Sequence, residues 1–186
     1  PVILVTGGSL GALHINKTVA RIIPQLLPRF NVIHQAGDRS IDWMKEYRQS
    51  IDFNLRPRYF LVDFLKTEGG LDQMLEAINL ADLVIARAGA NTLAELAVAG
   101  KAMILIPYKH AANDHQLKNA RLLEEKGAAR VIIDDDLEPK ILKQTINQFF
   151  ENNRNVLKES REKAKKFFSG DGLEIVSQAI LDKLKE

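Results

Sequence analysis

The chain has 186 residues, of which 46% are hydrophobic and 27% charged, with a formal net charge of +2, and this is enough for a sizeable buried core. The small net charge, without an arginine-rich stripe interleaved with aromatic residues, argues against nucleic acid as a partner. The absence of cysteine excludes disulfides and thiolate metal sites, and no apolar stretch approaches the roughly 20 residues of a membrane span. The chain opens at Pro1 directly on a strand-like run without a signal-peptide pattern, so we expect it to be a piece of a longer protein.

Six apolar runs rich in β-branched residues predict strands, at residues 2–6, 31–35, 59–62, 82–86, 102–107 and 129–133. Helical patterns lie between them, at about 13–28, 40–51, 71–80, 92–99 and 114–126. Strands without polar alternation that alternate with helices indicate a parallel sheet covered on both faces. The sequence therefore predicts one α/β domain over residues 1–186, with a Rossmann-like parallel sheet and a helical C-terminal tail from about 138 to 186.

The loop after the first predicted strand is TGGSLGA, residues 6–12. Ligands of such sheets bind beyond the carboxyl ends of the strands. Gly7, Gly8 and Gly11 allow the backbone to bend and approach a ligand, and Ser9 offers a hydroxyl. The helix that follows directs its free amides to the same place, which suits a phosphate. A tight strand-to-helix turn without a ligand is the alternative.

The glycine-rich loop does not fit a nicotinamide dehydrogenase. The G-x-G-x-x-G spacing is absent, because Gly7 and Gly8 are adjacent and residue 12 is alanine. The second strand ends on Gln35 where a ribose-binding acid is expected, and Asp38 comes too late.

A second loop, ARAGANTLAEL at residues 86–96, joins two other buried runs. Arg87 follows the strand and Gly89 allows the bend. Asn91 or Thr92 is expected to cap the helix while other amides stay available for a guest.

Glu95 lies one turn into that helix. A carboxylate can accept hydrogen bonds from both hydroxyls of a ribose whose phosphates sit at the helix end. The alternative is that Thr92 and Glu95 form an ordinary T-x-x-E capping box.

The third loop, residues 107–120, places His115 and Gln116 in the first turn of a helix, with Lys109 and His110 before it. Gln and neutral His can donate and accept, as sugar hydroxyls require. A metal pair of His110 and His115 would lack carboxylates at ligand spacing. A merely polar helix start is the other alternative.

Taken together, these motifs resemble the C-terminal half of the MurG family of GT-B glycosyltransferases. The resemblance rests on GGSLGA (7–12) with Asn16, and on residues 81–96, 99–108 and 114–129, and it extends from residue 1 to about 185. It implies that the chain is the C-terminal donor-binding domain of an enzyme that transfers GlcNAc from UDP-GlcNAc to lipid I, forming lipid II in peptidoglycan synthesis.

The resemblance also implies roles for individual residues. Leu65 would contact uracil, Glu95 the ribose, and His115 and Gln116 the GlcNAc hydroxyls. The implied substrate-binding set is Gly8, Ser9, Leu65, Arg87, Ala90, Asn91, Thr92, Leu93, Ala94, Glu95, His115 and Gln116. Two features depart from the family: His115 stands where many relatives carry glutamine, and KTEGG at residues 66–70 looks inserted beside the uracil loop.

The implied mechanism is a single inverting displacement in which a helix dipole and backbone donors stabilise the departing UDP, with no cofactor and no metal. No catalytic residue is expected in this chain. The general base, the site for the lipid-linked acceptor and the peripheral contact with the inner face of the plasma membrane are all expected in an N-terminal half.

Two alternative functions are a separate donor-binding subunit of a two-subunit GlcNAc transferase and a non-catalytic UDP-sugar-binding module. A UDP-GlcNAc epimerase would need catalytic acids that the sequence does not offer. The basic stretch 154–168 could meet an anionic membrane. Because Glu159 and Glu162 interrupt it, a solvated helix face is the favoured interpretation.

Overall fold

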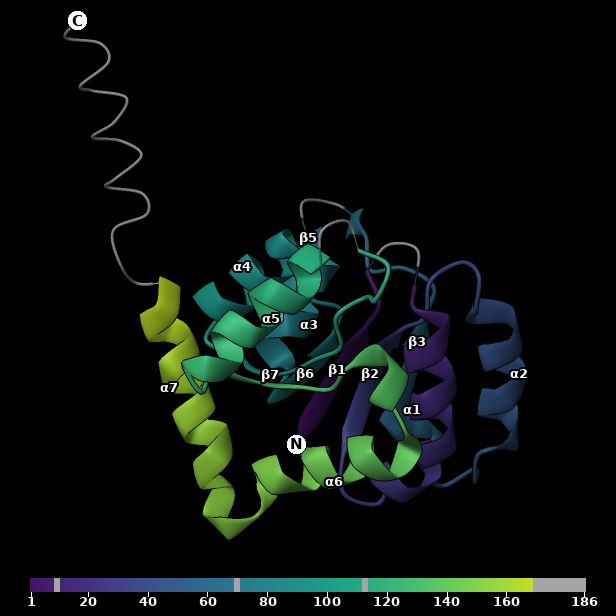
Figure 1. The fold of residues 1–186 in the computed structure, drawn as a ribbon. Helices are drawn as coiled ribbons and strands as arrows, with labels where there is room; N and C mark the ends of the chain where they lie inside the picture. The colour runs from purple at the N-terminus through teal and green to yellow at the C-terminus, as the bar shows by residue number, and fades with distance from the viewer. Residues whose placement is uncertain (9–10, 69–70, 112–113, 169–186) are drawn as a thin grey trace, which may run out of the picture.

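The computed structural model describes residues 1–8, 11–68, 71–111 and 114–168. Its main sheet has six parallel strands in the order β3-β2-β1-β6-β7-β8 (Figure 1). These are β1 Val2–Thr6, β2 Asn31–Gln35, β3 Tyr59–Val62, β6 Leu83–Ala86, β7 Ala102–Leu105 and β8 Ala129–Val131. All six predicted strands are therefore present, the last three shorter than expected. The strand order reverses between β1 and β6, which is where ligands bind in such sheets.

Seven α-helices of the described residues surround this sheet: α1 Leu13–Leu26, α2 Ile41–Ser50, α3 Gln73–Leu80, α4 Ala90–Val98, α5 His115–Glu125, α6 Pro139–Phe150 and α7 Asn155–Phe168. Short 3₁₀ turns lie at Arg56–Arg58 (η1), Asp134–Asp136 (η3) and Asn152–Arg154 (η4). Helices α1, α2 and α6 cover one face of the sheet, and α3, α4 and α5 cover the other. The Rossmann-like prediction is confirmed.

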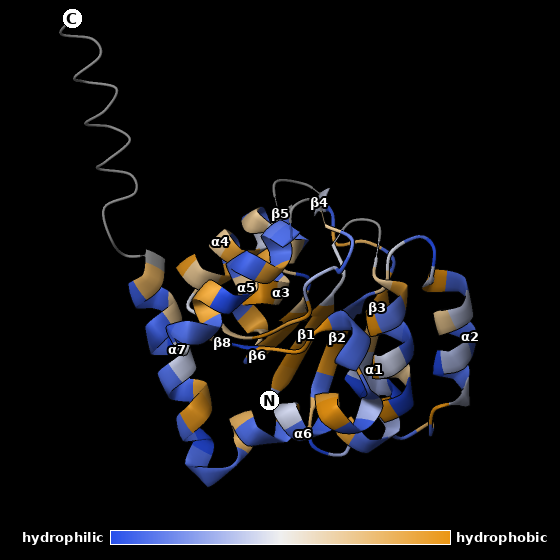
Figure 2. Ribbon diagram, in the orientation of Figure 1, coloured by the Kyte–Doolittle hydropathy of each residue, from blue (hydrophilic) through white to orange (hydrophobic). Residues whose placement is uncertain are grey.

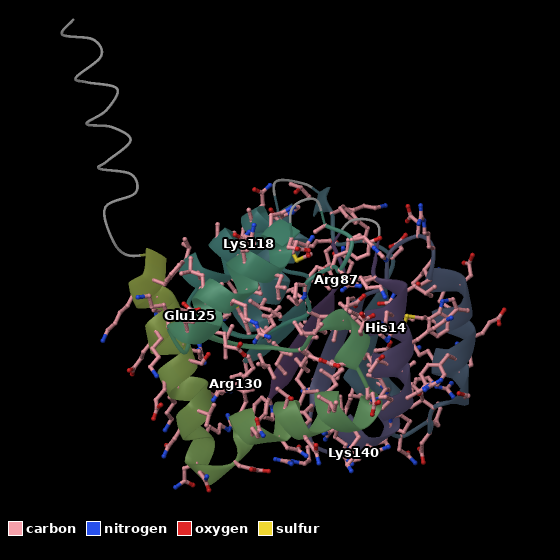
Figure 3. The ribbon with its side chains drawn as sticks, viewed as in Figure 1. His14, Arg87, Lys118, Glu125, Arg130 and Lys140 are labelled. Atoms are coloured by element: carbon pink, nitrogen blue, oxygen red, sulfur yellow. The ribbon has the colours of Figure 1, made fainter. Side chains whose placement is uncertain are left out.

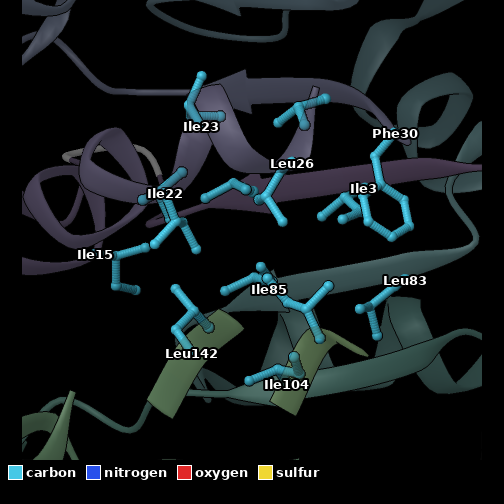
Figure 4. Close-up of a cluster of buried hydrophobic side chains, with 14 of the residues drawn as sticks. Ile3, Ile15, Ile22, Ile23, Leu26, Phe30, Leu83, Ile85, Ile104 and Leu142 are labelled. Atoms are coloured by element: carbon cyan, nitrogen blue, oxygen red, sulfur yellow. The ribbon is translucent and has the colours of Figure 1, made fainter. Parts of the chain in front are cut away.

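Each central strand supplies two hydrophobic clusters, one on each face of the sheet. In β1, Ile3 and Val5 belong to the cluster under α1, and Leu4 belongs to the cluster under α4. Successive side chains of a strand point to opposite faces, so a strand buried on both faces must be apolar at every position. Figure 4 shows the first cluster, and Figure 2 shows the apolar strands between helices whose outer faces are polar.

The predicted helix 71–80 begins two residues later than expected. Residues Thr67–Glu68 (β4) and Leu71–Asp72 (β5) pair as a small antiparallel hairpin in the region where the sequence departs from the family; Gly69 and Gly70 of KTEGG lie outside the described residues. Asp72 then caps α3, its Oδ1 accepting from the amides of Met74 at 2.9 Å and Leu75 at 3.1 Å. A carboxylate at this position fixes the start of the helix because it satisfies amides that have no partner within the helix.

The predicted cap of the helix after β6 was wrong. Helix α4 starts at Ala90 and its N-cap is Gly89, in extended conformation with φ −68° and ψ 142°. Asn91 and Thr92 therefore lie inside the first turn, and Thr92 with Glu95 cannot form the capping box, since that motif needs the threonine at the N-cap. Because glycine has no side chain, it leaves the first amides of α4 to other acceptors.

The helices of the predicted tail pack against the domain. Helix α6 buries Leu142 and Ile146, and α7 buries Leu157, Ser160 and Ala164 on one face. The basic residues of α7 lie mainly on its outer side, as a solvated helix face requires. None of the described helices combines the length and apolar composition needed to cross a bilayer. The part of the predicted helical tail from residue 169 to 186 lies outside the described residues.

Candidate functional site

Two adjoining cavities open where the carboxyl ends of β1 and β6 meet, at the point of strand reversal. One has a volume of about 420 Å³ and the other about 790 Å³. Thr6, Gly8 and Thr92 line both, so the cavities form two parts of one cleft. We call the smaller part the apolar cavity and the larger part the charged cavity.

The loop after β1 is shaped by its glycines. Gly8 and Gly11 have φ of +78° and +72°, and the Gly11 amide donates to the Gly8 carbonyl at 3.0 Å. A Cβ on Gly11 would stand 2.1 Å from the carbonyl oxygen of Ala36. Helix α1 follows with Ala12 as its N-cap, without a side-chain acceptor for the first amides. The Gly8 amide donates to Thr6 Oγ1 at 3.2 Å, so the donors that adjoin the cleft here are the uncapped first amides of α1. The predicted phosphate contact of this loop stays a prediction, and Ser9 lies outside the described residues.

Gln35, at the end of β2, ties this loop to the loop after β3. Its Nε2 donates to the Gly8 carbonyl at 3.0 Å, and its Oε1 accepts from the Leu65 amide at 3.4 Å. The side chain is fully buried. Gln35 therefore sets the distance between the glycine-rich loop and Leu65 across the apolar cavity.

Beneath the glycine-rich loop, a buried chain of polar groups joins α1 to β2. His34 contacts the Asn16 Oδ1 at 3.0 Å and the Tyr59 hydroxyl at 2.9 Å, and Asn16 Nδ2 donates to the Ala36 carbonyl at 2.7 Å. Since Asn16 Oδ1 can only accept, the His34 Nε2 carries the proton and Nδ1 accepts from Tyr59. Burial lowers the His34 pKa to about 3, so the imidazole is neutral.

The apolar cavity is a slot with a carboxylate at one end. Leu65, Phe64, Met74 and Ile78 supply its apolar walls, and Glu95 is exposed on α4 at its edge. The β4–β5 hairpin adds Thr67 and Asp72 to the lining. An apolar slot that ends in a carboxylate suits a flat heterocycle joined to a vicinal diol.

The charged cavity gathers most of the ionisable groups around the cleft. Its charged and imidazole lining residues are His14, Arg39, Arg87, Lys109, His110, Asp134 and Asp135. Lys109 Nζ pairs with Asp135 Oδ1 at 2.6 Å at the exposed rim. This hydrogen bond, helped by the lysine charge, raises the pKa of Lys109 and lowers that of Asp135. Positive groups outnumber carboxylates here, so the cavity favours an anion.

Arg87 joins the loop after β6 to the segments that follow β7 and β8. Its Nη1 donates to Asp134 Oδ1 at 2.7 Å and to the Ile106 carbonyl at 3.1 Å, and the guanidinium lies 5.4 Å from the centre of the Tyr108 ring. The Arg87 and Asp134 side chains are only 13% and 8% exposed. Arg87 therefore holds the loop after β6 against the ends of β7 and β8, and it faces the cavity from a fixed position.

Of the two residues predicted to contact the hexosamine, one lines the cleft and the other does not. Gln116 lines the charged cavity, and its Oε1 accepts from the Tyr108 amide at 2.9 Å, which leaves its amide nitrogen to donate. His115 is exposed and does not line either cavity as far as the described residues define them.

The remaining predicted residues all lie in the first turns of α4 and differ in how exposed they are. Thr92 lines both cavities, Ala90 and Asn91 are exposed at the start of α4, Ala94 is half-buried, and Leu93 packs in the core. Leu93 lines neither cavity and its amide donates to the Gly89 carbonyl at 3.0 Å, so its predicted contact with a ligand is not supported by the geometry. Sequence reasoning did not single out Arg39, Asp134 or Asp135. The two aspartates closely follow β8, so their place after a strand was a usable signal.

Among the described residues, no cluster of three or more His, Cys, Asp or Glu side chains could hold a metal ion. The predicted independence from metal stays a prediction.

Comparison with known proteins identifies the family. The model of the glycosyltransferase family 28 C-terminal domain matches residues 2–174. The chain belongs to this family. Solved structures show the same fold. The crystal structure of Acinetobacter baumannii MurG superposes on this chain with a TM-score of 0.75 at 30% identity, covering 97% of this chain and 49% of that one. The calicheamicin glycosyltransferase CalG4 shares the fold at 16% identity, with a TM-score of 0.67 and coverage of 100% and 43%.

Two curated relatives carry the same name, UDP-N-acetylglucosamine--N-acetylmuramyl-(pentapeptide) pyrophosphoryl-undecaprenol N-acetylglucosamine transferase. The one from Thermodesulfovibrio yellowstonii is 37% identical over 96% of this chain and 48% of its own length. The one from Syntrophotalea carbinolica is 41% identical over 82% of this chain and 41% of its own length. This glycosyltransferase family 28 chain thus spans about half the length of the curated relatives it matches.

Proposed function

We propose that this chain is the donor-binding domain of an N-acetylglucosaminyltransferase that takes GlcNAc from UDP-GlcNAc and adds it to lipid I in peptidoglycan synthesis. The observation that carries the proposal is the two-part cleft, in which an apolar slot with Glu95 at its edge adjoins a cavity rich in cations. The named relatives support the choice of sugar and acceptor.

In this proposal uracil lies in the apolar cavity against Leu65, and the ribose hydroxyls donate to Glu95. The diphosphate passes Gly8 and the uncapped start of α4, where Gly89 leaves amides available. The sugar reaches Gln116 in the charged cavity. The Leu65 amide already donates to Gln35, but at 3.4 Å this is a long hydrogen bond that an approaching base edge can share.

This chain's own groups act on the leaving diphosphate. Backbone donors of the glycine-rich loop and of α4, with the nearby cations, stabilise the charge that develops as the bond from the sugar C1 to the phosphate oxygen breaks. The acceptor site and its general base would belong to an N-terminal domain, which would also make the peripheral contact with the cytoplasmic face of the plasma membrane. The 186-residue chain is then expected to bind donor without turning it over.

Calorimetric titration tests the proposal directly. The chain should bind UDP-GlcNAc and UDP in buffer containing EDTA, and NADH should bind more weakly or not at all. UDP-GalNAc compares the two sugar epimers at the Gln116 end of the cleft. Tighter binding of NADH than of UDP would contradict the assignment, and binding that disappears with EDTA would contradict the metal-free arrangement.

A further inference from the structure

His14 borders the charged cavity close to a carboxylate. It lies in the first turn of α1, its side chain is 45% exposed, and it lines the charged cavity beside the glycine-rich loop. Its Nδ1 is 3.5 Å from Oδ1 of Asp134, the carboxylate that also accepts from Arg87. Figure 3 shows His14 and Arg87 on the same side of the molecule, coming from α1 and from the loop after β6.

We propose that His14, held beside Asp134, contacts the donor diphosphate in its protonated form and makes donor affinity depend on pH. This inference rests on the proposed function, because it assumes that the diphosphate passes through the charged cavity.

The charges of the cavity explain why such a contact matters. Arg39, Arg87 and Lys109 face two carboxylates, Asp134 and Asp135, so the lining has one net positive charge while its histidines are neutral. In a nucleotide sugar each phosphorus has one ester link and one anhydride link, so the diphosphate carries about two negative charges across the neutral range. Protonation of His14 adds one positive charge to the lining, so that the lining neutralises more of the negative charge of the ligand.

Several charged groups surround His14, and Asp134 Oδ1 lies 3.5 Å from its Nδ1. The groups that face it are Asp134 and Asp135 on η3, Arg39 after β2, Arg87 after β6, and Lys109 and His110 after β7, with Lys17 one turn along α1. A bound diphosphate adds negative charge beside His14 and so favours the imidazolium. By linkage, binding then takes up a proton, and affinity rises as pH falls.

UDP-GlcNAc is the correct probe, because its diphosphate has no group that titrates near neutral pH. UDP has a terminal phosphate with a second pKa of about 6, which would add a pH dependence of its own. Titration of the full chain at about pH 6, 7 and 8, each in buffers of different ionisation enthalpy, measures both affinity and proton uptake. The wild type should bind about threefold to tenfold more tightly at the lowest pH than at the highest, since one unit of pKa shift corresponds to tenfold.

His14→Gln should lose this pH dependence and the proton uptake assigned to His14, with little change in thermal midpoint because the side chain is half exposed. His110→Gln is the matched control, since His110 lines the same cavity but packs edge-on against Tyr108, with ring centroids 5.5 Å apart. Its pH dependence should persist.

A flat affinity and no proton uptake in the wild type would overturn the inference and leave the proposed function standing. The same holds if His14→Gln keeps the full pH dependence and His110→Gln loses it. No UDP-GlcNAc binding at any pH would overturn the proposed function and this inference together.

Discussion

The Gln35 amide nitrogen donates to the Gly8 carbonyl at 3.0 Å, and this hydrogen bond joins the end of β2 to the loop that begins the cleft. Gln35 Oε1 simultaneously accepts from Leu65 at 3.4 Å. One buried amide thus positions both the phosphate side and the base side of the candidate site. Sequence reasoning used Gln35 only to exclude a dinucleotide site.

Gln35→Leu should weaken UDP binding by about threefold to thirtyfold, because Gly8 and Leu65 lose the partner that fixes their separation. Loss of both Gln35 hydrogen bonds should also lower the free energy of unfolding by about 1–3 kcal/mol, because the Leu65 amide loses its acceptor and the Gly8 carbonyl keeps only the Gly11 amide as a donor. Calorimetry and urea denaturation measure the two effects. Unchanged UDP affinity in a destabilised protein would show that Gln35 supports the fold but not the site.

Gly11→Ala and Gly89→Ala form a contrasting pair. Alanine at residue 11 meets the Ala36 carbonyl at 2.1 Å and must adopt φ +72°, so the free energy of unfolding should fall by at least about 2 kcal/mol. At residue 89 a Cβ meets nothing within 4 Å and φ is −68°, so stability should change by less than about 1 kcal/mol. Since Gly89 lines the charged cavity, its substitution should weaken UDP binding. Normal UDP affinity in Gly89→Ala would contradict the proposed position of the diphosphate beside Gly89.

Glu95→Gln tests the ribose contact. The carboxylate should accept from two hydroxyls, and a hydrogen bond to a charged group contributes about 1.5–3 kcal/mol, so UDP affinity should fall by about tenfold to a hundredfold. Glu95 is exposed and does not belong to a capping box, so thermal stability without ligand should hardly move.

The control for Glu95→Gln is 2′,3′-dideoxy-UDP. The wild type should bind it weakly, and the variant should bind it no more weakly. An equal loss for UDP and for the dideoxy compound would show that Glu95 acts elsewhere than on the ribose.

His34 should make stability depend on pH. Its folded pKa of about 3 lies below the unfolded value of about 6.5, so the unfolded chain binds an extra proton between these values. Its contribution is fully present above about pH 6.5 and is lost as pH falls toward 3, with a slope approaching 1.4 kcal/mol per pH unit. Urea denaturation at several pH values measures this.

His34→Gln is the comparison for that experiment. It should be less stable than the wild type at neutral pH, because Asn16 and Tyr59 lose their shared partner. Its stability should fall less steeply with acid. Parallel curves for the two proteins would show that other groups cause the acid loss.

The sequence by itself determined the sheet, the glycine-rich turn and the general position of the cleft. Strands buried on both faces must be apolar at consecutive positions, and this pattern is visible locally at residues such as 2–6 and 83–86. Gly11 was likewise recognisable, because only glycine readily takes a left-handed turn close to another backbone.

Tertiary structure decided what local pattern could not. T-x-x-E at Thr92 and Glu95 fits a capping box, but the cap is fixed by the extended backbone of Gly89, which the residue types do not reveal. Arg87 was assigned to the ligand by its place after a strand, yet its ion-pair partner Asp134 lies 47 residues further along the chain. Arg87 follows β6 and Asp134 follows β8, with β7 between the two strands. The carboxyl ends of parallel strands lie along one edge of the sheet, and only the folded sheet brings the two side chains within hydrogen-bond distance.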